Sequence, residues 1–157
     1  MSGDALRPSV DADMLGLCGD ALAAARPLCT LSQGLALVAG AGVAFAGAFA
    51  DDVAVALAAW GVALASGLAA QGLAYRIAFD ARVFAQLATD AAHGPLDFAR
   101  FDAAMLRLGL MSAAKAGRDA EARCRGALGL VRALGVAVVV QAVLVMLGGL
   151  ALASPAS

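Results

Sequence analysis

The sequence predicts an all-α integral membrane protein with three transmembrane helices and a helical region on the cytoplasmic side. Hydrophobic residues make up 62% of its 157 residues and charged residues only 15%. A typical soluble domain has about a quarter of its residues charged. The apolar residues also collect in three uncharged blocks, each close to the roughly 20 residues that cross a bilayer as a helix.

Residues 1–30 are predicted to form a cytoplasmic tail that contains a short amphipathic helix. Pro27 should end this helix, because proline lacks the N–H group that a helix interior requires. The three aspartates of the helix argue against attraction to anionic lipids, so we expect it to pack on the rest of the cytoplasmic region. The apolar residues that can share its inner face are Leu15, Leu17, Cys18, Leu22 and Ala25.

The first two spans, residues 31–50 and 53–75, are predicted to form a helical hairpin. Asp51 and Asp52 alone separate them and are placed to cap the N-terminus of the second helix. Small residues recur in both spans and let helix backbones approach closely in lipid. We expect them to pack the two helices together, with contact to another subunit as the alternative. They are Gly34, Gly40, Gly42, Gly47, Gly61, Ala65, Gly67 and Gly72.

Residues 76–132 are predicted to form a cytoplasmic helical region built from extensions of the second and third spans. The second helix has no stop signal before His93-Gly94-Pro95, so it should continue well beyond its span. The third span covers residues 133–153 and leads to a short periplasmic tail within residues 133–157.

A short bridging helix is predicted between these two extensions. Asp97 is placed to cap it, and a turn from Gly109 to Gly117 should follow it. Its apolar stripe, at spacings of three and four residues, consists of Phe98, Phe101, Met105 and Leu108. Two ion pairs at i,i+4 spacing are expected at the start of the last helix: Asp119–Arg123 and Glu121–Arg125.

The distribution of basic residues predicts the topology. Nine of the eleven Lys and Arg residues lie between Arg76 and Arg132, which places that segment in the cytoplasm by the positive-inside rule. Three spans then give a cytoplasmic N-terminus and a periplasmic C-terminus. The use of ten arginines to one lysine, with much alanine and glycine, suggests a GC-rich bacterial genome and hence the bacterial inner membrane.

Three glutamines are the candidate polar residues inside the spans. Gln33 and Gln71 should meet across the hairpin, whereas Gln141 should lie deeper in the third span. Such amides usually bond neighbouring helices, and lining a water-filled path is the alternative. The spans contain no ionisable Asp, Glu, Lys, Arg or His side chain, so the usual marker of an ion or proton pathway is absent from the sequence.

No cofactor, metal site or catalytic site is expected from the sequence. His93 has Asp90 and Asp97 nearby, but one imidazole and two carboxylates on different elements are too few to predict a metal site. Cys18, Cys29 and Cys124 lack metal-ligand spacing. No phosphate-binding loop and no nucleophile motif is visible.

The first functional hypothesis is therefore a non-enzymatic accessory or scaffold subunit that docks on a larger membrane complex. Its predicted partners are membrane lipid and another membrane protein, or itself as a homo-oligomer, and not nucleic acid. The expected partner-binding residues are the stripe named above and Arg118, Arg123 and Arg125, whose guanidinium groups also suit anionic lipid headgroups. The alternative is a small homo-oligomeric channel or transporter with Gln71 and Gln141 facing the pore.

Overall fold

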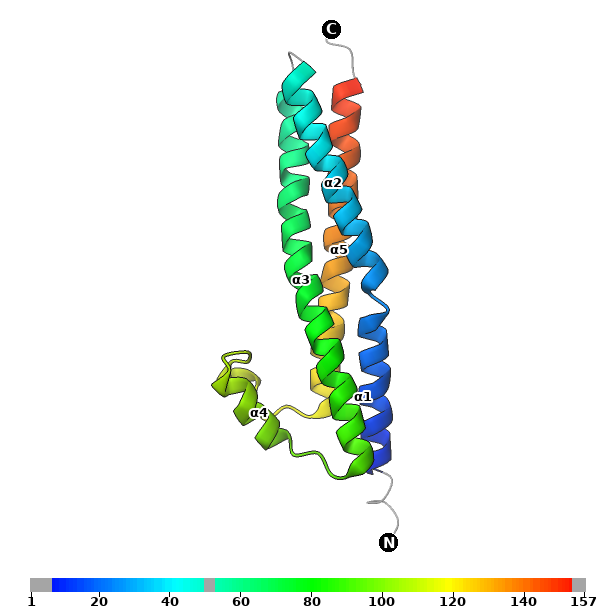
Figure 1. Ribbon diagram of the computed structural model, residues 1–157, viewed down its shortest axis with the longest axis vertical. Coiled ribbons are helices and arrows are strands. Elements are labelled where there is room, and N and C mark those ends of the chain that lie inside the picture. The colour runs from blue at the N-terminus through cyan, green and yellow to red at the C-terminus, as the bar shows by residue number, and fades with distance from the viewer. Residues whose placement is uncertain (1–6, 50–52, 154–157) are drawn as a thin grey trace. The chain divides into compact units, whose positions relative to one another are not determined.

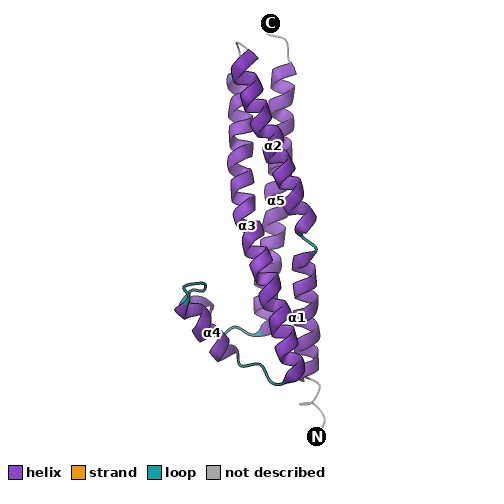
Figure 2. Ribbon diagram, viewed as in Figure 1, coloured by secondary structure: helices purple, strands orange, loops and turns teal. Residues whose placement is uncertain are grey.

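The computed structural model describes residues 7–49 and 53–153, and within these ranges the chain forms helices and connecting loops only (Figure 2). Three helical segments, Asp11–Ala48, Ala54–His93 and Ala120–Ala153, are long and apolar enough to cross a membrane. The all-helical class with three candidate spans is thus confirmed. The elements in order are α1 (Arg7–Ala23), α2 (Arg26–Phe49), α3 (Ala54–His93), α4 (Phe98–Arg107), the 3-10 helix η1 (Ala113–Lys115) and α5 (Ala120–Ala153).

The N-terminal helix differs from its prediction in two ways. Helix α1 ends at Ala23 and not at Pro27, and Pro27 lies instead in the first turn of α2. A proline is tolerated there because its missing N–H group would have no partner in a first turn. The predicted capping role of Asp51 and Asp52, and the chain ends at 1–6 and 154–157, lie outside the described residues.

The chain divides into two compact units, each described here by itself. Unit one comprises residues 1–23 and 78–129, and unit two comprises residues 24–77 and 130–157. Helices α3 and α5 each contribute to both units.

Unit two is a bundle of α2, the first part of α3 and the last part of α5 (Figure 1). Its core is built mainly from alanines around one large side chain, Trp60, which is buried. The indole Nε1 of Trp60 donates a hydrogen bond to the Val145 carbonyl oxygen at 3.1 Å. Trp60 is the largest side chain of this cluster, and partly buried residues such as Leu57, Leu64 and Leu144 pack against it. The core alanines are Ala39, Ala46, Ala56 and Ala63.

Only some of the span glycines are close-packing positions. A Cβ atom added at Gly42 would lie 2.7 Å from the Trp60 ring, and one added at Gly67 would lie 3.3 Å from Ala36 Cβ on α2 and 2.7 Å from Gln141 Nε2 on α5. The prediction that small residues pack the hairpin is therefore confirmed at these two glycines. It is wrong for the other predicted glycines, which have no atom within 4 Å of an added Cβ: Gly34, Gly40, Gly47, Gly61 and Gly72.

In unit one, α1 packs against the last part of α3. This packing was expected because the aspartates of α1 disfavour contact with anionic lipids. A Cβ at Gly19 would meet the Ala85 backbone nitrogen at 3.4 Å, so the two helices approach closely there. On α1, Leu15 and Leu22 are buried, but Leu17 is 71% exposed and its predicted place on the inner face is wrong. Residues two apart on a helix point in different directions, which separates Leu17 from Leu15.

Candidate functional site

Helix α4 has both of its ends fixed by local hydrogen bonds. The Asp97 carboxylate accepts a hydrogen bond from the Arg100 N–H at 2.9 Å, which confirms the predicted N-terminal cap. At the other end, Gly109 has a φ of +67°, a backbone conformation that favours glycine. The N–H of Leu110 bonds the Met105 carbonyl, and that of Gly109 bonds the Leu106 carbonyl, both at 3.0 Å. These two bonds form a Schellman motif that ends the helix.

A buried ion pair joins α4 to the beginning of α5. The Arg123 Nη2 atom lies 2.8 Å from Asp102 Oδ2, and the two side chains are only 10% and 6% exposed. The same carboxylate oxygen accepts a hydrogen bond from the Gly117 N–H at 2.8 Å. Gly117 has a φ of +73°, so a glycine is favoured where the loop turns toward the carboxylate. Asp102 therefore holds both the loop and α5 against α4.

The aromatic residues of α4 complete the surroundings of Arg123. Its guanidinium carbon lies 5.0 Å from the centre of the Phe98 ring and 5.7 Å from that of Phe101. Its Nε–H donates to the Arg118 carbonyl at 2.9 Å. Both rings are within the range of a cation–π interaction, which is stronger when the cation is shielded from water. Arg123 is thus bonded on several sides within the protein.

The charge of Asp102 is maintained by these partners. Desolvation by burial alone would raise its pKa, but the hydrogen bonds from Arg123 and the Gly117 N–H, together with the guanidinium charge, lower the pKa of Asp102 below its ordinary value. Asp102 is therefore ionised at neutral pH. Its Oδ1 atom is buried without a hydrogen-bond partner among the described residues.

The predicted partner-binding residues separate into an internal group and an exposed group. Met105 is buried, the Arg123 side chain is only 10% exposed, and Phe98 and Phe101 are half-buried around it, so these four act mainly within unit one. The exposed group consists of Leu108, Arg118 and Arg125.

The two ion pairs predicted on α5 have different outcomes. Arg125 pairs with Glu121 on the helix surface, as predicted. The expected Asp119–Arg123 pair is wrong, because Arg123 bonds Asp102 instead. The Asp119 carboxylate accepts a hydrogen bond from the Ala122 N–H at 2.7 Å, which caps the first turn of α5.

Several polar side chains of unit two form hydrogen bonds from one helix to another. Gln141 is fully buried, accepts from the Ser32 hydroxyl at 2.8 Å and donates to the Ser32 carbonyl at 3.1 Å. Gln33 Nε2 donates to Gln71 Oε1 at 3.2 Å, which confirms the predicted meeting of these two amides. Ser66 donates to a carbonyl of α5 at 3.3 Å. The Gln141 amide is thus engaged inside the bundle.

Two cysteines far apart in the sequence come together in unit one. Cys18 and Cys124 are both buried free thiols. They line an apolar groove of 450 Å³ between α1 and α5. Among the described residues, no three His, Cys, Asp or Glu side chains lie close enough to hold a metal ion.

His93 contacts its own helix. Its Nδ1 lies 2.7 Å from the Thr89 carbonyl oxygen, and the ring is exposed. The nearby carboxylates have other partners, since Asp90 accepts from Gln86 at 2.9 Å and Asp97 caps α4. The structure therefore gives His93 a local contact at the end of α3.

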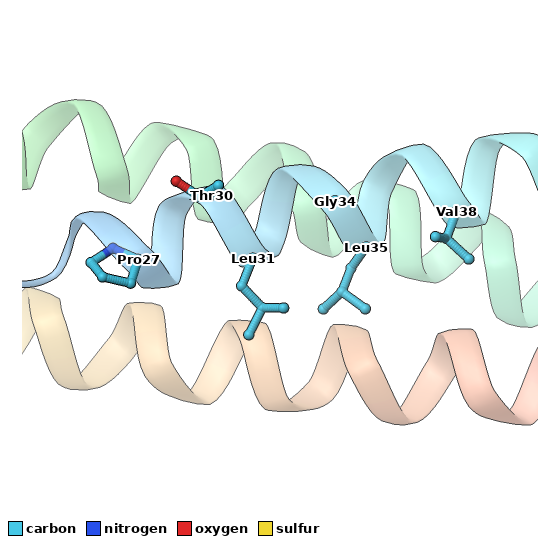
Figure 3. A pocket seen from close by; sticks show the side chains of 6 residues that line it. All are labelled: Pro27, Thr30, Leu31, Gly34, Leu35 and Val38. Atoms are coloured by element: carbon cyan, nitrogen blue, oxygen red, sulfur yellow. The ribbon is translucent and has the colours of Figure 1, made fainter.

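A second groove, of 680 Å³, runs along the exposed side of α2. Leu31 and Leu35 project from the same side of α2 (Figure 3). The one hydroxyl in its lining, that of Thr30, bonds the Arg26 carbonyl at 3.4 Å. The groove therefore offers apolar contact. Its lining residues are Pro27, Thr30, Leu31, Gly34, Leu35 and Val38.

Sequence reasoning missed three residues that join helices within one unit. Asp102 does so in unit one, and Trp60 and Ser32 do so in unit two. A signal existed for Asp102: it follows Phe98 by four residues and precedes Met105 by three, so a charge occupies the apolar stripe of α4. Such a charge requires a buried partner. No comparable signal distinguishes Ser32.

No protein-family model, curated protein or solved structure matches the chain.

Proposed function

We propose that this chain is a non-enzymatic accessory or scaffold subunit of a larger complex in the bacterial inner membrane. In this proposal residues 76–132 and the N-terminus are cytoplasmic and the C-terminus is periplasmic, as the charge distribution favours. The docking surface is a stripe of mainly small residues on the exposed side of α3. The contrast between this stripe and the bulky side chains exposed on α5 is the observation that carries the proposal.

One stripe on the exposed side of α3 has the composition of a helix-packing surface, and beside it α3 exposes the bulkier Val55, Leu68 and Tyr75. The residues of the stripe follow one another at spacings of three and four, and all are exposed in unit two. Helices in membranes associate through small residues, because lipid removes the hydrophobic effect that drives helices together in water. This stripe, called the α3 seam below, consists of Ala58, Val62, Ala65, Ala69 and Gly72.

The exposed face of α5 has a different composition. It carries bulky side chains, which fill the space between acyl chains better than they fit a close helix contact. Its exposed members include Val136, Val139, Val143, Met146 and Leu150. The difference between the two faces favours lipid beside α5 and a helix of another subunit beside the α3 seam.

The engagement of polar groups inside the units also supports a structural role. Gln141 is fully buried and its amide bonds Ser32 through both its oxygen and its nitrogen, so in this conformation it does not face a water path. Arg123 is equally engaged by Asp102 and the aromatic rings of α4. Polar groups that bond within the protein are typical of a structural role.

The experiment compares two glycine variants by native mass spectrometry after gentle extraction from the host membrane. Gly72 lies in the α3 seam and Gly149 lies on α5, and an added Cβ meets no atom within 4 Å at either position. Gly72→Leu and Gly149→Leu therefore leave packing within the chain unchanged. We expect the parent chain and Gly149→Leu to carry a stoichiometric foreign subunit and Gly72→Leu to lose it.

Retention of that subunit by Gly72→Leu would remove the α3 seam from the interface. A homo-oligomer without any foreign subunit in the parent chain would contradict the accessory role. In that case the channel or transporter hypothesis would take its place.

A further inference from the structure

The end of α4 carries exposed leucines beside exposed basic residues. Leu108 is 70% exposed, and Leu106 and Leu110 are also exposed. Arg107, Lys115 and Arg118 are exposed in the same short stretch of chain. The name α4 tip is used below for these six residues: Leu106, Arg107, Leu108, Leu110, Lys115 and Arg118.

The charge of the α4 tip has one sign. Residues 103–118 contain no aspartate or glutamate, and the preceding carboxylate, Asp102, is buried and neutralised by Arg123. Within the described part of the chain, no ion pair is formed by the side chains of Arg107, Lys115 and Arg118. The α4 tip thus carries three solvated cations and three exposed leucines within one short stretch of chain.

The α4 tip is held in place by the contacts already described. The Schellman motif at Gly109 fixes the chain after Leu108, and the Gly117 N–H bonds Asp102 at 2.8 Å. Because the backbone is ordered by these bonds, a ligand does not have to order it on binding. The exposed leucines are therefore presented by a preorganised surface.

We propose that the α4 tip binds anionic phospholipid headgroups at the cytoplasmic face of the membrane, with Leu108 and its neighbouring leucines entering the interface. Basic side chains near an anionic surface are attracted to it, and guanidinium groups form strong hydrogen bonds with phosphate oxygens. Leucines between such cations gain apolar contact at the boundary of the acyl chains. The proposal rests on the membrane location proposed above, but not on any partner of the α3 seam.

The test is amide hydrogen exchange of the full chain in nanodiscs of two compositions. One contains phosphatidylcholine alone, and the other contains equal amounts of phosphatidylcholine and phosphatidylglycerol. We expect exchange of the α4-tip amides to slow on the order of ten-fold or more in the anionic nanodiscs. The difference should disappear at about 1 M salt, where the Debye length is about 3 Å.

Three variants identify the contacts. Lys115→Glu and Arg118→Glu should each reduce the slowing by on the order of five-fold. Leu108→Ser should also reduce it, because a hydroxyl gains less than an isobutyl group from entering the interface. Arg125→Glu makes the same charge change on α5 outside the tip, next to Glu121, and should leave the slowing unchanged.

Equal exchange in the two compositions would overturn the proposal, and so would slowing that Arg125→Glu removes as strongly as Arg118→Glu. If slow exchange is seen in host membranes but in neither nanodisc, the tip binds a protein and not lipid. Loss of the foreign subunit from Gly72→Leu with an unchanged lipid effect would separate this surface from the α3 seam.

Discussion

Replacing Asp102 with alanine is expected to detach α4 and its following loop from α5. The variant leaves the Arg123 guanidinium buried without its carboxylate, and removing one partner of a buried ion pair costs about 3–5 kcal/mol. The Gly117 N–H loses its acceptor as well. Hydrogen exchange of the α4 amides in the detergent-solubilised chain measures the loss as a lower free energy of local opening.

Two controls separate the ion pair from general damage. The double variant Asp102→Leu/Arg123→Met replaces the pair with apolar side chains and should recover most of the protection, because neither charge is then left unpaired. Glu121→Ala breaks the exposed pair with Arg125 and should change the opening free energy by less than about 1 kcal/mol. Normal protection in Asp102→Ala would show that the ion pair does not hold α4.

Strong acid should weaken the same contact between Asp102 and Arg123. The pKa of Asp102 is lowered from 3.8 in the folded protein, so the folded state holds fewer protons than the unfolded state between the two pKa values. The contribution of this carboxylate to stability is therefore complete above pH 3.8 and is lost as the pH falls through the folded pKa. Protection of α4 should accordingly persist at neutral pH and decline only in strong acid.

Replacing Gly148 with valine is expected to disrupt the core of unit two. A Cβ atom at this position would lie 2.6 Å from Trp60 Cδ1 and 2.7 Å from Cε2. The indole has little room to move away, because Gly42 adjoins its other edge and its Nε1 bonds the Val145 carbonyl. Overpacking of a core costs about 1–3 kcal/mol or more, and we expect the upper end here. Unfolding of the detergent-solubilised chain, followed by Trp60 fluorescence, measures the effect.

The adjacent glycine supplies the matched control. Gly149→Val has the same change in helix propensity, but an added Cβ there meets no atom within 4 Å, so it should alter stability far less. Trp60→Leu combined with Gly148→Val should recover part of the loss by making room for the valine. Because this double variant has no tryptophan, its unfolding and that of Gly148→Val are compared by circular dichroism of the helices. Equal destabilisation by the two glycine variants would mean that Trp60 does not lie against Gly148.

The long helices were predictable because their signals are local. Three uncharged apolar blocks fix the candidate spans, and the cap at Asp97 and the glycine after Leu108 fix the ends of α4. The same holds for the pair of Glu121 and Arg125, whose spacing alone brings them together.

The contacts between helices were not predictable in the same way. Gly148 and Gly149 are adjacent in the sequence, yet only the first meets Trp60, because the rotation of α5 about its axis depends on its neighbours. The i,i+4 spacing favoured Asp119 as the partner of Arg123. Asp119 is used as a cap, which left Arg123 to Asp102, a residue 21 positions away on another helix.

The most direct test of the account is the location of the two chain ends in the cell. Green fluorescent protein fluoresces in the cytoplasm, whereas alkaline phosphatase is active only after export to the periplasm. With three spans, a green fluorescent protein fused before Met1 should fluoresce, and an alkaline phosphatase fused after Ser157 should be active. A C-terminal green fluorescent protein that fluoresces, together with an inactive C-terminal phosphatase, would place both ends in the cytoplasm and contradict the three-span account.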